Sequence, residues 1–214
     1  MAVPGAAVGG WPAGGRRFLD STTVIKVATK AAPGKNPSSM LGWFAAPQDG
    51  SGCTDKILFC TGDGPPSTGT NDENRARAFA LELPSPGHAQ ARYYQGGGPY
   101  DMNDIIDKDR ALSIAVTDAQ WHHIAVVDNG KELIVYLDGE VIGQRAIVDT
   151  ARNTAAGYVI GGWPDPNRYF TGFLAGVQFY SAAVTAVDVG NAMTSTKPGE
   201  AVLRCVTRIG LSAS

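Results

Sequence analysis

The stretch Gln120–Ile142 reads Q-W-H-H-I-A-V-V-D-N-G-K-E-L-I-V-Y-L-D-G-E-V-I, and this stretch decides the fold. Its three apolar runs, Ile124–Val127, Leu133–Leu137 and Val141–Ile142, are separated by Asp-Asn-Gly and Asp-Gly-Glu. Asn-Gly and Asp-Gly tolerate the positive φ that two-residue hairpin turns require. The pattern therefore predicts three antiparallel strands joined as a meander. A helix is disfavoured because β-branched residues crowd the runs and glycine interrupts them.

The composition fits one large all-β domain. The chain has 214 residues, 27 of them Gly and 13 Pro, which suits many short strands separated by turns. The charged fraction of 18% argues against wholesale disorder, and the net charge of −2 provides no basic surface for nucleic acid. Since no apolar run approaches the roughly 20 residues of a membrane span, we expect neither a nucleic acid nor a membrane as partner.

Further strands are expected on both sides of the meander, because β-branched and alternating apolar residues recur between Gly- and Pro-rich turns. We predict strands over Thr22–Val27, Met40–Ala45, Lys56–Cys60, Arg75–Leu83, Ala89–Tyr94, Ala111–Val116, Tyr158–Ile160 and Phe170–Tyr180. A helix-like turn is expected over Ser181–Val189, followed by a linker, Ser195–Glu200.

The order of motifs from Leu112 to Val189 resembles that of laminin G-like domains in the concanavalin A-like lectin/glucanase superfamily. W-H-H-I-A-V at Trp121–Val126 is followed by Y-L-D-G at Tyr136–Gly139, then by I-G-G at Ile160–Gly162 and by F-T-G at Phe170–Gly172. The resemblance implies an antiparallel β-sandwich of the concanavalin A-like jelly-roll type. It also implies a non-catalytic binding module that recognises glycans through its rim loops.

The chain divides into three parts in this interpretation. Residues 1–17 form a Gly/Pro-rich N-terminal arm, residues 18–194 the jelly-roll domain, and residues 195–214 a C-terminal extension. Within the extension, Ala201–Ile209 has the pattern of a final strand, and we expect it to pair near the N-terminal strand, as chain ends do in jelly rolls. The arm is either a coil packed along the surface or a segment that grips a neighbouring subunit.

The residues needed for catalysis are sparse. The E-x-D-x-E strand by which glucanases of this fold present paired carboxylates is absent, and no G-x-S-x-G motif occurs. Successive strand residues point to opposite faces, so we expect one of His122 and His123 to pack inward with a satisfied ring nitrogen and the other to be exposed. We therefore predict that the protein is not an enzyme.

The loop between Gly162 and Phe170 is the main candidate for ligand contact, since it combines aromatic planes with groups that hydrogen-bond hydroxyls. Its candidate residues are Trp163, Asp165, Asn167, Arg168 and Tyr169. The alternative is that the aromatic residues cover the sandwich edge and that Asp165–Asn167 only turns the chain. Tyr94 and Tyr100, which flank the glycine-rich loop Gly96–Gly98, form a second candidate platform.

Calcium is the one metal that the resemblance suggests. Calcium takes six to eight oxygen ligands, and the polar loops offer Asp63, Asp72 and Asp101. The same residue types are common in ordinary turns, so both interpretations stay open. Cys53 and Cys60 either close a small disulfide loop in an oxidising environment or remain free thiols.

A structural or assembly role is the rival function. The protein would then be a virion decoration or fibre protein, or a peripheral subunit of a large complex, with other protein subunits as partners in place of a glycan. Met1–Gly15 lacks the features of a signal peptide. Even so, we expect an extracellular or particle-surface location over a cytoplasmic one.

Overall fold

The structure is a computed structural model, and it describes only part of the chain. The described residues are 9–10, 16–18, 25–27, 38–46, 56–61, 77–85, 88–95, 102–103, 118, 120–146, 158–162, 170 and 172–198. The strands predicted over Ala111–Val116 and Ala201–Ile209 lie outside these residues, as does Cys53, so those strands and the disulfide stay predictions. None of the described helices is long and apolar enough to cross a membrane.

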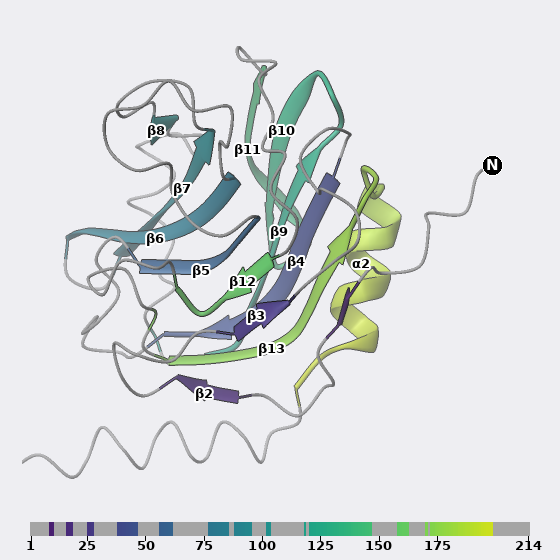
Figure 1. Ribbon diagram of the computed structural model, residues 1–214. Helices are drawn as coiled ribbons and strands as arrows, with labels where there is room; N and C mark the ends of the chain where they lie inside the picture. The colour runs from purple at the N-terminus through teal and green to yellow at the C-terminus, as the bar shows by residue number, and fades with distance from the viewer. Residues whose placement is uncertain are drawn as a thin grey trace, which may run out of the picture.

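Two antiparallel sheets form the molecule (Figure 1). Sheet A contains, in spatial order, β1 (Gly9–Gly10), β13 (Gly172–Tyr180), β4 (Ser38–Ala45), β9 (His122–Asp128), β10 (Glu132–Leu137) and β11 (Glu140–Ala146), with β2 (Arg16–Phe18) also paired to β13. Sheet B contains β3 (Ile25–Val27), β12 (Tyr158–Ile160), β5 (Lys56–Thr61), β6 (Arg77–Ser85), β7 (His88–Gln95) and β8 (Met102–Asn103). The all-β antiparallel sandwich expected from the sequence is confirmed.

The meander forms as β9, β10 and β11, but its two turns differ. Leu137 pairs with Glu140 across a two-residue turn in which Asp138 and Gly139 both have positive φ, 51° and 88°. This is the predicted turn. The first connection is longer, because Asp128 pairs with Leu133, and the Asn129 side chain accepts hydrogen bonds from the backbone N–H groups of residues 131 and 132. The expectation of a two-residue turn there is wrong, because the Asn129 side chain stabilises a wider Asx-type loop.

The core lies between the two sheets. Every second residue of β4, β9 and β10 points into it, as the period of a strand requires. Phe179 of sheet A connects the layers, since its ring stacks on that of Tyr158 at 3.9 Å and meets that of Phe59 edge-on at 6.3 Å. The buried cluster around them is Met40, Phe44, Ala46, Leu58, Ile124, Val126, Leu133, Val135, Leu137, Ile142, Ile160, Phe170, Leu174 and Val177.

The outer face of sheet A is covered by a helix, α2 (Ala186–Ser195) (Figure 1). The helix starts where it does because Thr185 and Asp188 form a reciprocal capping box. The helix-like turn predicted over Ser181–Val189 is therefore displaced toward the C-terminus, and the predicted linker begins inside the last turn of the helix. Val189 and Ala192 are buried against Leu41, Ala125, Val127 and Tyr136.

Strand β4 holds this helix at both ends. The Ser39 hydroxyl donates to the carbonyl of Ala182 at 2.9 Å and accepts from the N–H of Val184 at 3.0 Å. Four residues along the same strand face, the Trp43 indole N–H donates to the Thr196 hydroxyl at 3.1 Å. The helix is thus fixed to one strand by a hydrogen bond beyond each of its ends, with the apolar cluster between them.

The N-terminal arm contributes backbone to sheet A. Gly9 pairs with Phe179 and Gly10 with Gln178, whereas β2 pairs with the beginning of β13. The described parts of the arm therefore lie along the edge of their own domain. The domain boundaries expected at residues 17/18 and 194/195 remain predictions.

Candidate functional site

The strand register places several chain segments at one end of the sandwich. Phe44, near the end of β4, pairs with His122 at the start of β9, and Ala45 pairs with Phe173 near the start of β13. Leu137, at the end of β10, pairs with Ile124. The Asp138-Gly139 turn therefore lies at the end of the sandwich where β4 ends and where β9 and β13 begin, which we call the Asp138 end.

The loop of residues 163–169 leaves from and returns to a buried stem. The N–H of Gly161 donates to the carbonyl of Leu58 at 2.7 Å, and the N–H of Phe170 donates to the carbonyl of Gly161 at 3.0 Å. Gly161, Gly162 and Phe170 are all buried. Gly172 follows at a φ of 153° that disfavours other residues, and a Cβ there would lie 2.6 Å from both the Ala45 carbonyl oxygen and Cζ of Phe170. The returning strand is therefore held against β4 at the Asp138 end.

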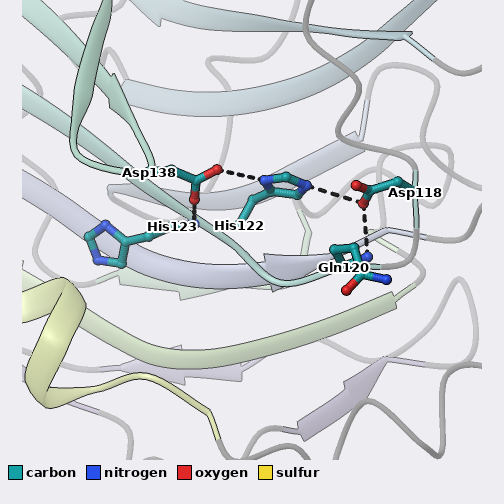
Figure 2. A network of polar contacts seen from close by, with 5 residues as sticks. All are labelled: Asp118, Gln120, His122, His123 and Asp138. Atoms are coloured by element: carbon teal, nitrogen blue, oxygen red, sulfur yellow. Dashed lines mark hydrogen bonds and ion pairs between the residues drawn. The ribbon is translucent and has the colours of Figure 1, made fainter.

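A polar network occupies the same end (Figure 2). Nδ1 of His122 lies 2.7 Å from Oδ2 of Asp138, and its Nε2 lies 3.1 Å from Oδ1 of Asp118. The second Asp138 oxygen accepts the backbone N–H of His123 at 2.7 Å, and Asp118 also accepts that of Gln120 at 2.8 Å. The Asp118 and Asp138 side chains are 39% and 46% exposed, so two carboxylates face solvent around a nearly covered imidazole.

The electrostatics of this network favour an imidazolium between carboxylates. Burial lowers the pKa of His122, but hydrogen bonds and charge from Asp138 and Asp118 outweigh burial and raise the pKa above its ordinary value of 6.5. Burial raises the pKa of Asp138, and the hydrogen bonds from His122 and from the His123 backbone outweigh it, so the net shift is downward. The two groups therefore stabilise each other in their charged forms.

His123 lies on the opposite face of the sheet, beneath the C-terminal end of α2. It is fully buried, its ring meets that of Trp43 edge-on at 5.2 Å, and neither ring nitrogen has a hydrogen-bond partner among the described residues. Burial lowers its pKa to about 4, against the opposing charge of Asp138. The two histidines do face opposite ways, but the expectation that one of them is exposed is wrong, since only 14% of the His122 side chain is exposed. The expectation that the buried one has a satisfied ring nitrogen is wrong, because the carboxylates lie beside His122.

The network presents hydrogen-bond acceptors to solvent. Both ring nitrogens of His122 face carboxylates, and in its doubly protonated form the ring has no lone pair to take a proton from water or a hydroxyl. No group of three His, Cys, Asp or Glu side chains that could hold a metal ion occurs in the part of the chain that the structure describes. The exposed oxygens of Asp118 and Asp138 can accept hydrogen bonds from a ligand's hydroxyl groups.

Most of the site residues expected from the sequence fall outside the described residues. These are Trp163, Asp165, Asn167, Arg168, Tyr169, Tyr100, Asp63, Asp72 and Asp101. The backbone of Tyr94 is described: it pairs with Ala78 and Met102, at the end of the sheet B strands opposite to Gly161. The two candidate platforms thus attach to opposite ends of these strands.

The network of Asp118, His122 and Asp138 was not predicted from the sequence, which indicated only a turn at Asp138. One signal was available. The predicted hairpin returns the end of its second strand to the beginning of its first, which places Asp138 near the two histidines; in the structure Leu137 pairs with Ile124.

Comparison with known proteins identifies the superfamily. A family model described as the concanavalin A-like lectin/glucanases superfamily matches residues 21–190. A search of curated proteins found no match.

Several solved structures share the fold. The CBM40 of the Ruminococcus gnavus IT-sialidase, solved bound to alpha2,3 sialyllactose, is similar with a TM-score of 0.60 and 11% identity, over 90% of this chain and 100% of that chain. A heptameric SAP-like pentraxin from Limulus polyphemus has a TM-score of 0.59 and 15% identity, over 82% and 79% of the two chains. Domain 4 of the extracellular arabinanase AbnA from Geobacillus stearothermophilus, in complex with arabinotriose, has a TM-score of 0.54 and 18% identity, over 81% and 74%. At these identities the likeness establishes the fold alone.

Proposed function

Because the chain belongs to the concanavalin A-like lectin/glucanase superfamily, we propose that it is a non-catalytic module that binds glycans at the Asp138 end. Two similar structures hold oligosaccharides, one sialyllactose and the other arabinotriose. These sugars differ in charge and in ring type, so they support a glycan as the ligand class without naming the sugar.

The observation that carries the proposal is the coincidence of a buried loop stem and exposed carboxylates at one end of the sandwich. The Phe170-to-Gly161 hydrogen bond fixes both ends of the 163–169 loop, so binding need not order the whole loop at its own cost. The proposed contacts in this loop are Trp163 and Tyr169, which would stack on sugar C–H faces, and Asp165, Asn167 and Arg168, which would hydrogen-bond hydroxyls. Asp118 and Asp138 would add acceptors.

The absence of catalysis is part of the proposal. It is supported by the full engagement of His122 with two carboxylates and by the lack of the paired-carboxylate strand used by glucanases of this fold. The outcome that would contradict it is release of reducing sugar from any glycan that the protein binds.

A glycan array followed by calorimetric titration tests the proposal. The full chain is screened against neutral and acidic oligosaccharides, and the best ligand is titrated against the wild type, Trp163→Ala and the matched variant Tyr94→Ala. We expect Trp163→Ala to weaken binding by about fivefold to thirtyfold, since an aromatic stacking contact contributes on the order of 1–2 kcal/mol, and Tyr94→Ala to leave it unchanged. Loss only in Tyr94→Ala would move the site to the Tyr94 and Tyr100 platform. No binding at millimolar concentration would overturn the proposal.

The assembly role is tested on the same material. The pairing of Gly9 and Gly10 with β13 of the same chain favours an arm that stays on its own domain. We therefore expect a monomeric mass by light scattering. A stable oligomer that dissociates when residues 1–15 are removed would support the assembly role instead.

We also propose Asp63, Asp72 and Asp101 as calcium ligands. If they bind calcium, EDTA lowers the Tm and added calcium restores it. If the Tm does not change on EDTA treatment and calcium addition, these residues do not form a calcium site.

A further inference from the structure

The contacts of His122 determine how many of its ring nitrogens must carry a proton. A carboxylate accepts hydrogen bonds and cannot donate them, so a ring nitrogen facing a carboxylate must carry a proton. Asp138 faces Nδ1 at 2.7 Å and Asp118 faces Nε2 at 3.1 Å. A neutral imidazole has only one N–H, so it can serve one of these two aspartates and not both.

We propose that His122 is a positioning residue that acts only in its doubly protonated form. In that form it ties the segment entering β9, through Asp118, to the β10–β11 turn, through Asp138. When the second proton leaves, the contact with Asp118 is the one that breaks.

Asp118 is the partner that is released, for two reasons. Its oxygen lies 3.1 Å from the His122 ring nitrogen, whereas the Asp138 oxygen lies 2.7 Å from the other nitrogen, a difference of 0.4 Å. Asp138 is also fixed by the backbone N–H of His123 and by a turn whose own N–H donates to the carbonyl of His123 at 2.8 Å. Asp118, by contrast, accepts only one further hydrogen bond from the described residues, that of the Gln120 N–H, and Gln120 lies within its own segment. The neutral ring therefore keeps Nδ1–H on Asp138 and turns a lone pair toward Asp118, which repels the carboxylate.

Among the described residues around His122, the two aspartates are the ones whose charge affects the protonation of its ring. On β4 its neighbour is the Phe44 ring, 5.8 Å away between centroids, which does not titrate. The adjacent His123 points to the other face of the sheet and is neutral throughout this range, because burial lowers its pKa to about 4. Among the described residues, Asp118 and Asp138 are thus the charged groups that contact the ring.

Glycan affinity then becomes pH-dependent, and this step rests on the proposed function. With His122 charged, both carboxylates are held at fixed positions around it. With His122 neutral, Asp118 and the chain entering β9 lose one anchor, so a ligand must order that segment on binding. Affinity should be highest near and below pH 6.5 and fall by about twofold to fivefold as the pH rises through the His122 transition, the range expected for one partly exposed ion pair.

The test combines a ligand-free and a ligand-bound measurement on the full-length protein. Nitrogen-15 spectra of the histidine rings are recorded from pH 5 to pH 9, with His122 assigned by its loss in His122→Gln. Titrations with the best oligosaccharide from the array are made at the same pH values. His122→Gln mimics the neutral ring, because its amide donates from one nitrogen only, and should bind equally weakly at every pH. His123→Phe is the matched control and should keep the wild-type pH dependence.

Each result supports or overturns the inference. A His122 ring with both nitrogens protonated at pH 6.5, together with affinity that falls on the same pH curve, supports it. A neutral tautomer at pH 6.5 overturns it, as does affinity that is flat with pH while the ring titrates. If the ring titrates above pH 6.5 but no glycan binds at any pH, the positioning of Asp118 by His122 stands and the proposed function fails.

Discussion

Two adjacent residues of the same type, His122 and His123, occupy opposite environments on the two faces of β9. His122 has both ring nitrogens bonded to carboxylates, and its pKa is raised. His123 is fully buried under the end of α2 with no partner among the described residues for either nitrogen, and its pKa is lowered to about 4. The difference shows that the charge of a strand histidine depends on which face it occupies.

The two residues have opposite effects on stability as the pH changes. For His123 the unfolded chain takes up its proton near pH 6.5 and the folded chain only near pH 4, so stability falls as the pH drops through that interval. For His122 the folded pKa lies above 6.5, so its contribution is fully present below pH 6.5 and is lost as the pH rises through the folded pKa. Together, the two histidines lower the free energy of unfolding when the pH falls well below neutrality and again when it rises well above it.

The largest expected effect comes from placing a permanent charge on the buried face. His123→Lys should lower the free energy of unfolding by about 3–5 kcal/mol at pH 7, because an ammonium group under α2 has no described counter-charge in contact. His122→Lys is the matched control, and its cost should stay below about 1 kcal/mol because Asp118 and Asp138 accept the charge. Urea unfolding of both variants measures the difference, and equal losses would contradict the comparison.

Acidification should reproduce part of this loss in the wild type. Between pH 7 and pH 4 the His123 contribution amounts to about 3 kcal/mol, since its pKa falls from 6.5 to about 4. His123→Phe removes the titrating group and should lose correspondingly less stability over the same interval, with little change at pH 7. If the two proteins lose the same amount in urea unfolding at pH 4 and pH 7, His123 does not titrate as described.

Asp138 hydrogen-bonds to the His122 ring and to the backbone N–H of His123, and neutralising it should cost less. Asp138→Asn keeps an acceptor but removes the charge beside His122, so we expect a loss of about 1–2 kcal/mol at pH 6. The loss should shrink at a second pH above the His122 transition, because the neutral ring no longer needs the charge. Thermal unfolding at the two pH values measures this, with Glu140→Gln in the same hairpin as the control. A loss that is independent of pH would mean that Asp138 acts only through the His123 backbone.

The smallest effect concerns the Thr196 hydroxyl, which accepts a hydrogen bond from the Trp43 indole. Thr196→Val keeps the side-chain shape but removes the acceptor for the Trp43 indole, so we expect a loss of about 1 kcal/mol. Hydrogen exchange of the α2 amides should rise in this variant and stay unchanged in Thr194→Val, whose hydroxyl bonds only within the helix. Equal exchange in both variants would show that Trp43 does not anchor the helix.

The strands of the sheets could be predicted from the sequence, because the residue patterns that specify them are local. Alternating apolar residues and the Asp138-Gly139 turn specify strands and register within a few residues of each other. The position of α2 was predicted imperfectly, since its start depends on the capping box of Thr185 and Asp188, with Asp in place of the usual Glu.

The polar network could not be predicted from the sequence, because its residues come together only when the strands pair. Asp118 and Asp138 each look like a turn residue in isolation, and nothing in W-H-H tells which histidine meets a carboxylate. That choice is made by the sheet, since His122 lies on the inner face beside the partly exposed Asp138 whereas His123 lies on the outer face, which α2 covers. Long-range placement of this kind is set by tertiary packing and not by residue pattern.

The stem of the 163–169 loop has a consequence for diversification and engineering. Its closing contacts, Gly161 to Leu58 and Phe170 to Gly161, join backbone atoms, so they do not depend on which side chains lie between. Foreign recognition sequences grafted between Gly162 and Phe170 should therefore inherit a scaffold that folds without them, much as antibody frameworks carry interchangeable hypervariable segments.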